Sequence, residues 1–248
     1  MSIVTKNGMK FKELVLVDKV KECEDIISFY FKDKDGKNLT KHKAGQFLPF
    51  QIQTEDPKYK GVMRTYSLSM IPNESMYRIS VKKVQNGLIS SYLHDNLQIG
   101  DIIEAMEPTG VFTIKQNHKN KPLVLISGGI GITPLLSMLY EESKYRNNIY
   151  FVQAVQNSSN HPFKNNIDGI CKFRDLKNIV FYSKPLVSDK EGEDFDFSGR
   201  VSKEWIEANL PLDADFYFCG PVPFMKGLES SLLDLDVEKE YINYEFFC

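Results

Sequence analysis

The length and spacing of the apolar segments change near residue 116, and this change constrains the fold more than any other feature of the sequence. Before it, short segments rich in β-branched and aromatic residues alternate with turn-forming stretches such as Asp33–Gly36. Many short strands with turns between them indicate an antiparallel barrel or sandwich. The predicted strands are Glu13–Val17, Ile26–Phe31, Phe47–Ile52, Tyr66–Met70, Tyr77–Val84 and Ile102–Ala105, and one helix is predicted over Leu88–Leu97.

After a polar stretch that ends in Pro122, strands and helices alternate, which favours a parallel sheet with crossover helices. The sequence therefore predicts two domains. An antiparallel β-barrel is expected over residues 9–115, and an α/β domain with a parallel five-stranded sheet over residues 121–248. Its predicted strands are Leu123–Ser127, Ile149–Val155, Ile179–Ser183, Asp215–Cys219 and Tyr241–Phe246, and its helices are Pro134–Tyr145, Ile167–Leu176, Lys203–Ala208 and Pro223–Leu235.

Length and charge exclude several classes of protein. The 248 residues suffice for two domains of ordinary size. Acidic and basic residues nearly cancel, 33 against 31, so no strong field attracts nucleic acid or an anionic membrane. No apolar run is long enough to span a bilayer, and the N-terminal stretch lacks the features of a signal peptide. We expect a cytoplasmic protein without a nucleic-acid partner or membrane insertion.

The cysteines argue against a metal site. They lie far apart in the sequence, form no CxxC pair and do not cluster with the histidines. Zinc and iron–sulfur sites need such clusters. No metal ligand is predicted, and the thiols of Cys23, Cys171, Cys219 and Cys248 are expected to be reduced.

The stretch Arg64–Ser69, with the sequence RTYSLS, suits a ligand that carries both a phosphate and a ring. The fork of an arginine matches a phosphate, and a tyrosine offers a flat face for stacking. By itself, the stretch fits an ordinary strand with a surface arginine equally well.

Gly87–Ser90 opens the helix predicted in the first half of the chain. A glycine and a serine at a helix start leave backbone N–H groups open to an anion. A plain helix cap has the same sequence signature, so this motif alone leaves both interpretations open.

Gly128–Pro134, with the sequence GGIGITP, follows a buried strand and opens a helix, which is the context of a phosphate-binding loop. We expect Thr133 to cap that helix and Pro134 to occupy its first helical position. The motif departs from G-x-G-x-x-G at its last position. The acidic ribose-binding residue expected roughly 20 residues later is also missing, because Gln156–Ser159 follows the next strand. A tight turn without a ligand is the alternative.

Cys219–Pro221, with the sequence CGP, stands at the end of a predicted strand. Open α/β sheets gather their ligands at the carboxyl ends of strands. A buried cysteine before a turn is also common as inert packing.

The four motifs occur in this order across a predicted β-barrel and a predicted α/β domain. In this combination the sequence resembles the ferredoxin–NADP⁺ reductase superfamily over nearly the whole chain. The end of the chain, Tyr244–Phe247, is most similar to the reductase half of flavohaemoglobins. The globin half of those proteins and the cysteines of a plant-type [2Fe–2S] domain are expected to be absent. The family usually has glycine after the last phenylalanine, where this sequence has Cys248.

The resemblance implies a site for FAD in the first domain. Arg64 would hold a phosphate of FAD, Tyr66 would pack on the isoalloxazine and ribityl part, and Ser67 would hydrogen-bond near flavin N5. Gly87 and Ser90 would hold the pyrophosphate. Leu68, in the same stretch as Ser67, and Lys82 belong to the implied cofactor-binding set, although a lysine on a strand is more often only solvated.

The resemblance also implies a nicotinamide nucleotide site in the second domain. Gly129, Gly131 and Thr133 would receive the phosphates, and Cys219 and Gly220 would line the nicotinamide pocket. Glu245 and Phe247 would sit by the flavin ring and guard it. Ser67 and Glu245 are the candidates for tuning the flavin or relaying a proton, and Cys219 is a wall of the pocket rather than a nucleophile.

The expected function is transfer of a hydride from nicotinamide C4 to flavin N5, with electrons leaving to a separate acceptor such as a ferredoxin, a flavodoxin-like carrier, a rubredoxin or a haem protein. Two alternatives are an electron-transfer subunit active only in a larger complex and a binding module without redox activity. NADH is expected over NADPH, because Gln153–His161 holds no arginine or lysine and Ser183–Val187 offers only Lys184. With no carboxylate there, exclusion of NADPH is expected to be modest.

Overall fold

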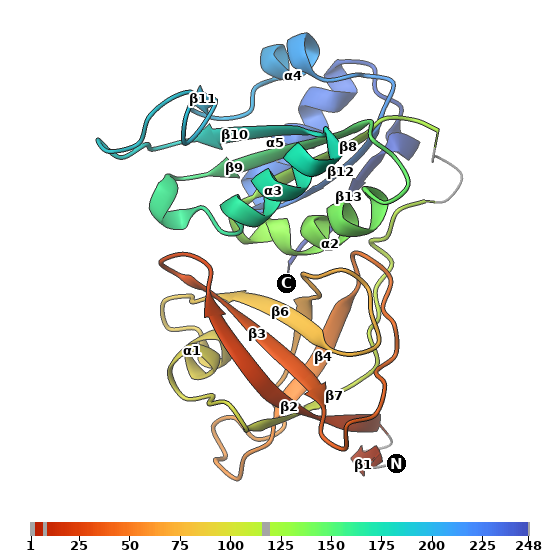
Figure 1. The fold of residues 1–248 in the computed structure, drawn as a ribbon, viewed down its shortest axis with the longest axis vertical. Helices are drawn as coiled ribbons and strands as arrows, with labels where there is room; N and C mark the ends of the chain where they lie inside the picture. Colours follow the sequence, from red (N-terminus) through yellow and green to blue (C-terminus); the bar gives the residue numbers. More distant parts are fainter. Residues whose placement is uncertain (1–2, 7–8, 116–119, 248) are drawn as a thin grey trace. The chain divides into compact units, whose positions relative to one another are not determined.

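The computed structural model describes residues 3–6, 9–115 and 120–247 (Figure 1). The chain divides into two compact units, residues 1–113 and residues 114–248. The division falls next to the polar stretch expected as a linker, most of which, residues 116–119, lies outside the described residues. Cys248 also lies outside them.

The first unit is an antiparallel β-barrel, as the sequence predicted. Its six barrel strands follow the order β5-β4-β7-β2-β3-β6. Strand β1 (Ile3–Lys6) pairs with the start of β2, residues 9–12. A bridge between Leu68 and Ile79 closes the barrel, and Ser69 N–H donates to the carbonyl of Arg78 over 2.9 Å. The strands are β2 (Met9–Lys21), β3 (Ile26–Asp33), β4 (Phe47–Ile52), β5 (Met63–Ser67), β6 (Tyr77–Lys82) and β7 (Ile102–Ala105).

Helix α1 (Leu88–Asp95) packs on the barrel core through Ile89 and Leu93. The same core contains the inward-facing side chains of the strands, such as Phe29 and Phe50, which are fully buried. Alternation of these residues with polar ones is the reason why most strands could be located from the sequence.

One barrel strand starts earlier than predicted. We expected a strand over Tyr66–Met70, but β5 runs over Met63–Ser67. Met63 and Arg64 pair with β4 although neither is buried, so they give no apolar signal. Beyond Ser67 the chain leaves β4 and crosses to β6.

The second unit is an α/β domain with a wholly parallel sheet in the order β11-β10-β9-β8-β12-β13. Its five longer strands are those predicted. The sixth, β11 (Phe197–Ser198), is too short to have a sequence pattern. The longer strands are β8 (Leu123–Gly128), β9 (Ile149–Val155), β10 (Lys177–Tyr182), β12 (Asp215–Cys219) and β13 (Ile242–Tyr244).

The strand order reverses at β8, because β9 and β10 lie on one side of it and β12 and β13 on the other. Figure 1 shows α2 and α3 together on one face of this sheet and α4 and α5 on the other. Such a reversal opens a crevice at the carboxyl ends of the two strands that flank it, here β8 and β12. The helices are α2 (Ile132–Glu142), α3 (Lys164–Arg174), α4 (Lys203–Asn209) and α5 (Val222–Asp234).

In the part of the chain that the structure describes, no helix combines the length and the apolarity needed to cross a bilayer. The cytoplasmic location expected from the sequence stays a prediction.

Candidate functional site

Strand β5 presents Arg64 and Tyr66 on one face, because alternate residues of a strand point the same way. Their direct partners on β4 are Phe50 and Leu48. Tyr66 stacks on Phe50 with 5.7 Å between ring centroids, and burial raises the pKa of Tyr66 to about 12, which keeps the phenol protonated. Arg64 is exposed, and its Nη1 donates to the neighbouring carbonyl of Met63 over 2.7 Å. An incoming phosphate could replace that local contact.

The two residues after Tyr66 take different places. Ser67 lies on the opposite face of β5 and is 7% exposed. Leu68 is fully buried in the barrel core, and its N–H donates to the carbonyl of Gln46 over 2.9 Å. Of the residues predicted from this motif, Arg64 and Tyr66 therefore present the more accessible side chains.

The start of α1 is tightly built around Gly87. A Cβ atom at this position would lie 2.3 Å from Ser90 Oγ, so no larger residue fits without a shift. Ser90 Oγ accepts a hydrogen bond from Val84 N–H over 3.3 Å. The first N–H groups of a helix have no acceptor within the helix, and they attract anions. Leu88 and Ile89 of α1 pack in the same core cluster as Tyr66, so the structure brings the first two motifs into one unit.

Lys82 has an ionic partner within this unit. Its ammonium lies 3.1 Å from a carboxylate oxygen of Asp25, and the next residue, Lys83, pairs with Asp95 at 2.7 Å. These contacts favour the interpretation of Lys82 as a surface lysine over that of a cofactor ligand.

The glycine loop of the second unit is pressed against the end of β12. A Cβ atom on Gly131 would lie 2.1 Å from the carbonyl oxygen of Cys219. A Cβ atom on Gly220 would lie 3.0 Å from Gly128 Cα, and one on Gly128 would lie 2.8 Å from the ring of Phe224. The third and fourth motifs are therefore in backbone contact at the reversal point of the sheet. Gly128 belongs to this contact, although the residues predicted from the motif are Gly129, Gly131 and Thr133.

Gly129 adopts a φ of +53°, in a 3₁₀ turn over Gly129–Gly131 that leads into α2. The predicted cap is wrong. Helix α2 begins at Ile132, so Thr133 does not cap it and Pro134 is its third residue instead of its first. The Thr133 hydroxyl donates back to the carbonyl of Ile130 over 3.1 Å. Because the side chain of Thr133 is buried, with 2% of its surface exposed, any contact of this turn with a phosphate would use backbone N–H groups.

Cys219 is completely buried at the carboxyl end of β12. Its Sγ donates to the carbonyl of Glu245 over 3.4 Å. Burial, with a smaller contribution from the Glu245 carboxylate, raises the pKa of the thiol well above its usual value. A neutral, enclosed thiol is a poor nucleophile, which agrees with a wall of a pocket.

The aromatic tail continues from β13 beside this cysteine. Tyr244 stacks on Phe218 with 5.2 Å between centroids, and Phe246 meets Tyr244 edge-on at 5.3 Å. Phe247 is 41% exposed, so it is not a core residue of a plain edge strand. Glu245 is half-buried, and burial raises the pKa of its carboxyl.

A chain of polar side chains runs along β9 and β10, from the carboxyl end of β10 to its amino end. His161, which is 5% exposed, contacts the Tyr182 hydroxyl through Nδ1 at 2.9 Å and Gln153 Oε1 through Nε2 at 3.0 Å. Gln153 Nε2 donates to Asn178 Oδ1 over 2.8 Å, and Asn178 Nδ2 donates to Asp168 over 2.7 Å. Burial, helped by the charge of Lys164, lowers the pKa of His161 to about 4.

We expect this histidine to make folding sensitive to acid. Its folded-state pKa of about 4 lies below the unfolded value of about 6.5, so the unfolded chain binds the proton first. Neutral His161 makes its full contribution to the free energy of unfolding above pH 6.5. This contribution falls by roughly 3 kcal/mol in all as the pH is lowered towards 4. Urea unfolding at pH 7.5 and pH 5 measures the loss. The variant His161→Gln should lose less stability over the same interval, and an equal loss would contradict the assignment.

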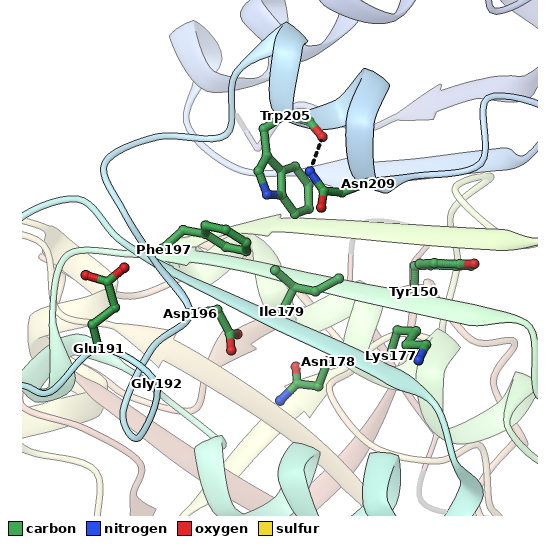
Figure 2. A pocket seen from close by; sticks show the side chains of 10 residues that line it. All are labelled: Tyr150, Lys177, Asn178, Ile179, Glu191, Gly192, Asp196, Phe197, Trp205 and Asn209. Carbon is green, nitrogen blue, oxygen red and sulfur yellow. Dashed lines mark hydrogen bonds between the residues drawn. The ribbon is translucent and has the colours of Figure 1, made fainter.

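A separate hollow of about 700 Å³ lies against the start of β10. Figure 2 shows Phe197 and Trp205 on one side of it and Lys177 and Asn178 on the other. These strand residues stand at the amino end of β10, whereas open α/β sheets bind ligands at the carboxyl ends. The hollow is therefore distinct from the glycine-loop site.

Comparisons with known proteins assign a family to each of the two units. A family described as an oxidoreductase FAD-binding domain matches residues 13–114, and one described as an oxidoreductase NAD-binding domain matches residues 125–230. The FAD/NAD-binding domain of nitric oxide dioxygenase from Vibrio cholerae is 30% identical with a TM-score of 0.86, over 95% of this chain and 98% of that one. The chain belongs to the family of flavohaemoprotein-like FAD- and NAD-binding oxidoreductase domains.

Within this family the relatives are flavohaemoproteins, as the sequence predicted. A flavohemoprotein of Bacillus thuringiensis is 42% identical over 96% of this chain and 61% of its own length. A flavohemoglobin of Malassezia yamatoensis, solved with bound FAD and heme, has a TM-score of 0.77 at 26% identity, over 98% of this chain and 61% of that one. The chain thus spans about three fifths of the length of the curated relatives that it matches. It is an NAD(P)H-dependent oxidoreductase that binds FAD and a nicotinamide nucleotide.

Proposed function

We propose that the protein takes a hydride from NADH onto FAD and passes the electrons singly or in pairs to a separate redox protein. The observation that carries the proposal is the glycine loop packed on Cys219 and Gly220 at the reversal point of the sheet. That contact fixes a phosphate-binding turn beside a strand end, which suits a dinucleotide. A protein that bound only FAD would not need a second phosphate-binding turn of this kind.

Bound FAD supplies the hydride acceptor and the route for electrons to leave. The residues of the first unit bind and orient it. Arg64 holds a phosphate with its guanidinium, Tyr66 packs against the ring and ribityl part, and the N–H groups after Gly87 hold the pyrophosphate. Ser67 donates a hydrogen bond near N5.

The residues of the second unit bind the nucleotide and exclude water. Gly129 and Gly131 present backbone N–H groups to the phosphates, and Cys219 and Gly220 shape the nicotinamide pocket. Burial raises the pKa of the Glu245 carboxyl, which suits a group that takes up and releases a proton during turnover.

The acceptor is proposed to be a haem protein. The curated relatives are named flavohemoproteins, a name that joins a flavin with a haem. A ferredoxin, a flavodoxin-like carrier or a rubredoxin is the next choice. An electron-transfer subunit with little activity by itself is the alternative.

Rapid mixing of the FAD-loaded protein with NADH under anaerobic conditions tests the first step. Bleaching of the flavin within a second, followed by turnover with ferricyanide, supports a competent reductase. Slow bleaching without a partner would favour the subunit. No bleaching at all, with FAD retained, would refute the hydride transfer. Turnover with a ferric haem protein, compared with a ferredoxin, then tests the acceptor.

Phe247→Ala is expected to raise nucleotide affinity or change nucleotide selectivity. Phe247 follows Glu245, whose carbonyl accepts from Cys219 Sγ, so the tail runs beside the proposed nicotinamide pocket. An aromatic ring there competes with nicotinamide for the same surface. Because the ring is 41% exposed, the stability loss should be well below the roughly 3–5 kcal/mol of a buried phenylalanine. The measurement is steady-state kinetics with NADH and with NADPH. If kcat and KM are unchanged in a folded variant, the tail is not part of the nucleotide site.

A further inference from the structure

Two loops at the carboxyl edge of the parallel sheet are tied together by one carboxylate. The Ser158 hydroxyl, in the 3₁₀ turn Ser158–Asn160 after β9, donates to Asp189 Oδ1 over 2.6 Å. Asp189 Oδ2 accepts from the N–H groups of Leu186, at 2.8 Å, and Ser158, at 3.3 Å. A second link runs from Asn157 Nδ2 to the carbonyl of Lys184 over 3.3 Å. The loop after β10 therefore delivers a carboxylate to the end of β9.

This edge is where the adenosine half of a dinucleotide belongs. With the phosphates at the glycine loop after β8, the adenosine ribose reaches over the end of the neighbouring strand, which is β9. In dinucleotide-binding folds an acidic residue at the end of that strand accepts from the ribose hydroxyls. The sequence has none there. The expectation that no carboxylate is present at this place is nevertheless wrong, because Asp189 comes from the loop after the next strand.

The charge of Asp189 is held in place. Partial desolvation acts to raise its pKa, but the hydrogen bonds from the Ser158 hydroxyl and from the N–H groups of Leu186 and Ser158 outweigh it and lower the pKa. A carboxylate oxygen has room for about two donors, so Oδ1, which accepts only from the Ser158 hydroxyl, can still accept from a sugar hydroxyl. Leu186 and Val187 in the same loop are exposed, which leaves apolar surface beside the carboxylate for a purine ring.

We propose that Asp189 is the residue that selects NADH against NADPH. The proposal rests on the nicotinamide nucleotide function proposed above. Asp189 Oδ1 accepts a hydrogen bond from the 2′-hydroxyl of the adenosine ribose of NADH. A 2′-phosphate removes that donor and brings close to two negative charges against a fixed carboxylate. Selection is therefore stronger than the neutral amide and hydroxyl side chains of the β9 end would give.

Lys184 is the residue that could oppose this selection. It is exposed in the same loop, and its ammonium could pair with a 2′-phosphate. Its backbone carbonyl is held by Asn157, but its side chain is not part of the Asp189 contacts. The other lysine of the loop, Lys190, is paired with Glu193 at 3.2 Å.

The experiment compares Asp189→Asn with Glu193→Gln. The first keeps the shape and an acceptor for Ser158 but removes the charge, and the second removes a charge from the same loop at a side chain that is 69% exposed. Values of kcat/KM for NADH and NADPH are measured with ferricyanide. We expect Asp189→Asn to raise the NADPH to NADH ratio at least about 10-fold and Glu193→Gln to leave it within about 2-fold. An unchanged ratio, or equal losses with both nucleotides, would overturn the proposal.

Two further measurements separate the possible failures. Titration calorimetry with 5′-AMP and 2′,5′-ADP measures binding at the adenosine site without turnover. An inactive protein that still discriminates between the two ligands would refute the reductase function and leave Asp189 in its role.

Ser158→Ala removes the hydroxyl tether but keeps the carboxylate. It should retain the preference for 5′-AMP, and loss of that preference would show that Asp189 acts only by holding the loop.

Discussion

Gly131→Ala is expected to abolish reduction of the flavin by NADH while leaving FAD bound. The added methyl group would lie 2.1 Å from the carbonyl oxygen of Cys219, and both partners of that clash are backbone. Neither can rotate away, so the glycine loop must move off the end of β12. We expect a cost of at least about 3 kcal/mol in the free energy of unfolding of the second unit. The rate of flavin bleaching should fall at least about 100-fold, as measured by stopped-flow absorbance.

Gly169→Ala is the matched control. Gly169 lies in α3 with open space where a Cβ atom would go, so the same change should be neutral or stabilising by about 0.5–1 kcal/mol. Its bleaching rate should equal that of the unmodified protein. A Gly131→Ala protein that bleaches at the normal rate would show that the loop and the strand end are not the nucleotide site.

Arg64→Ala is expected to weaken FAD binding by about 10- to 150-fold, since a charge-assisted contact worth about 1.5–3 kcal/mol is lost. Arg64 is exposed on β5 and its guanidinium donates to the carbonyl of the neighbouring Met63, so the fold itself should be little affected. Flavin fluorescence during reconstitution of the apoprotein gives the dissociation constant.

Lys82→Ala is the comparison for that result. The Lys82 ammonium already pairs with Asp25 at 3.1 Å, so its removal should change FAD affinity by less than about 2-fold. Equal losses in the two variants would mean that the first unit attracts FAD by general positive charge. Full retention of FAD in Arg64→Ala would place the phosphate elsewhere.

Most of the fold could be predicted because apolar periodicity reports burial. The buried run Leu123–Gly128 and the alternating residues of β3 are examples. The periodicity fails where strands have few buried residues. The start of β5 is exposed, and β11 has only two residues, so neither could be located.

The site could be predicted in part for a related reason. The glycine loop and the Cys219–Gly220 turn are local motifs, and local sequence determines their geometry. Asp189 reaches Ser158 from 31 residues away, through a loop without regular structure. Spacing rules assume that the acidic residue follows β9 directly, so they miss a carboxylate that arrives from the next loop.

The polar side chains along β9 and β10 form a hydrogen-bond chain that can run in only one direction. Asp168 is a pure acceptor, so it takes the amide N–H of Asn178 and leaves Asn178 Oδ1 to accept from Gln153. Gln153 then has only its oxygen for His161, which must carry its proton on Nε2 and accept from the Tyr182 hydroxyl at Nδ1. One surface carboxylate thus dictates the tautomer of a buried imidazole. These side chains therefore have a single proton arrangement, and it includes His161, the residue that directly follows the turn Ser158–Asn160.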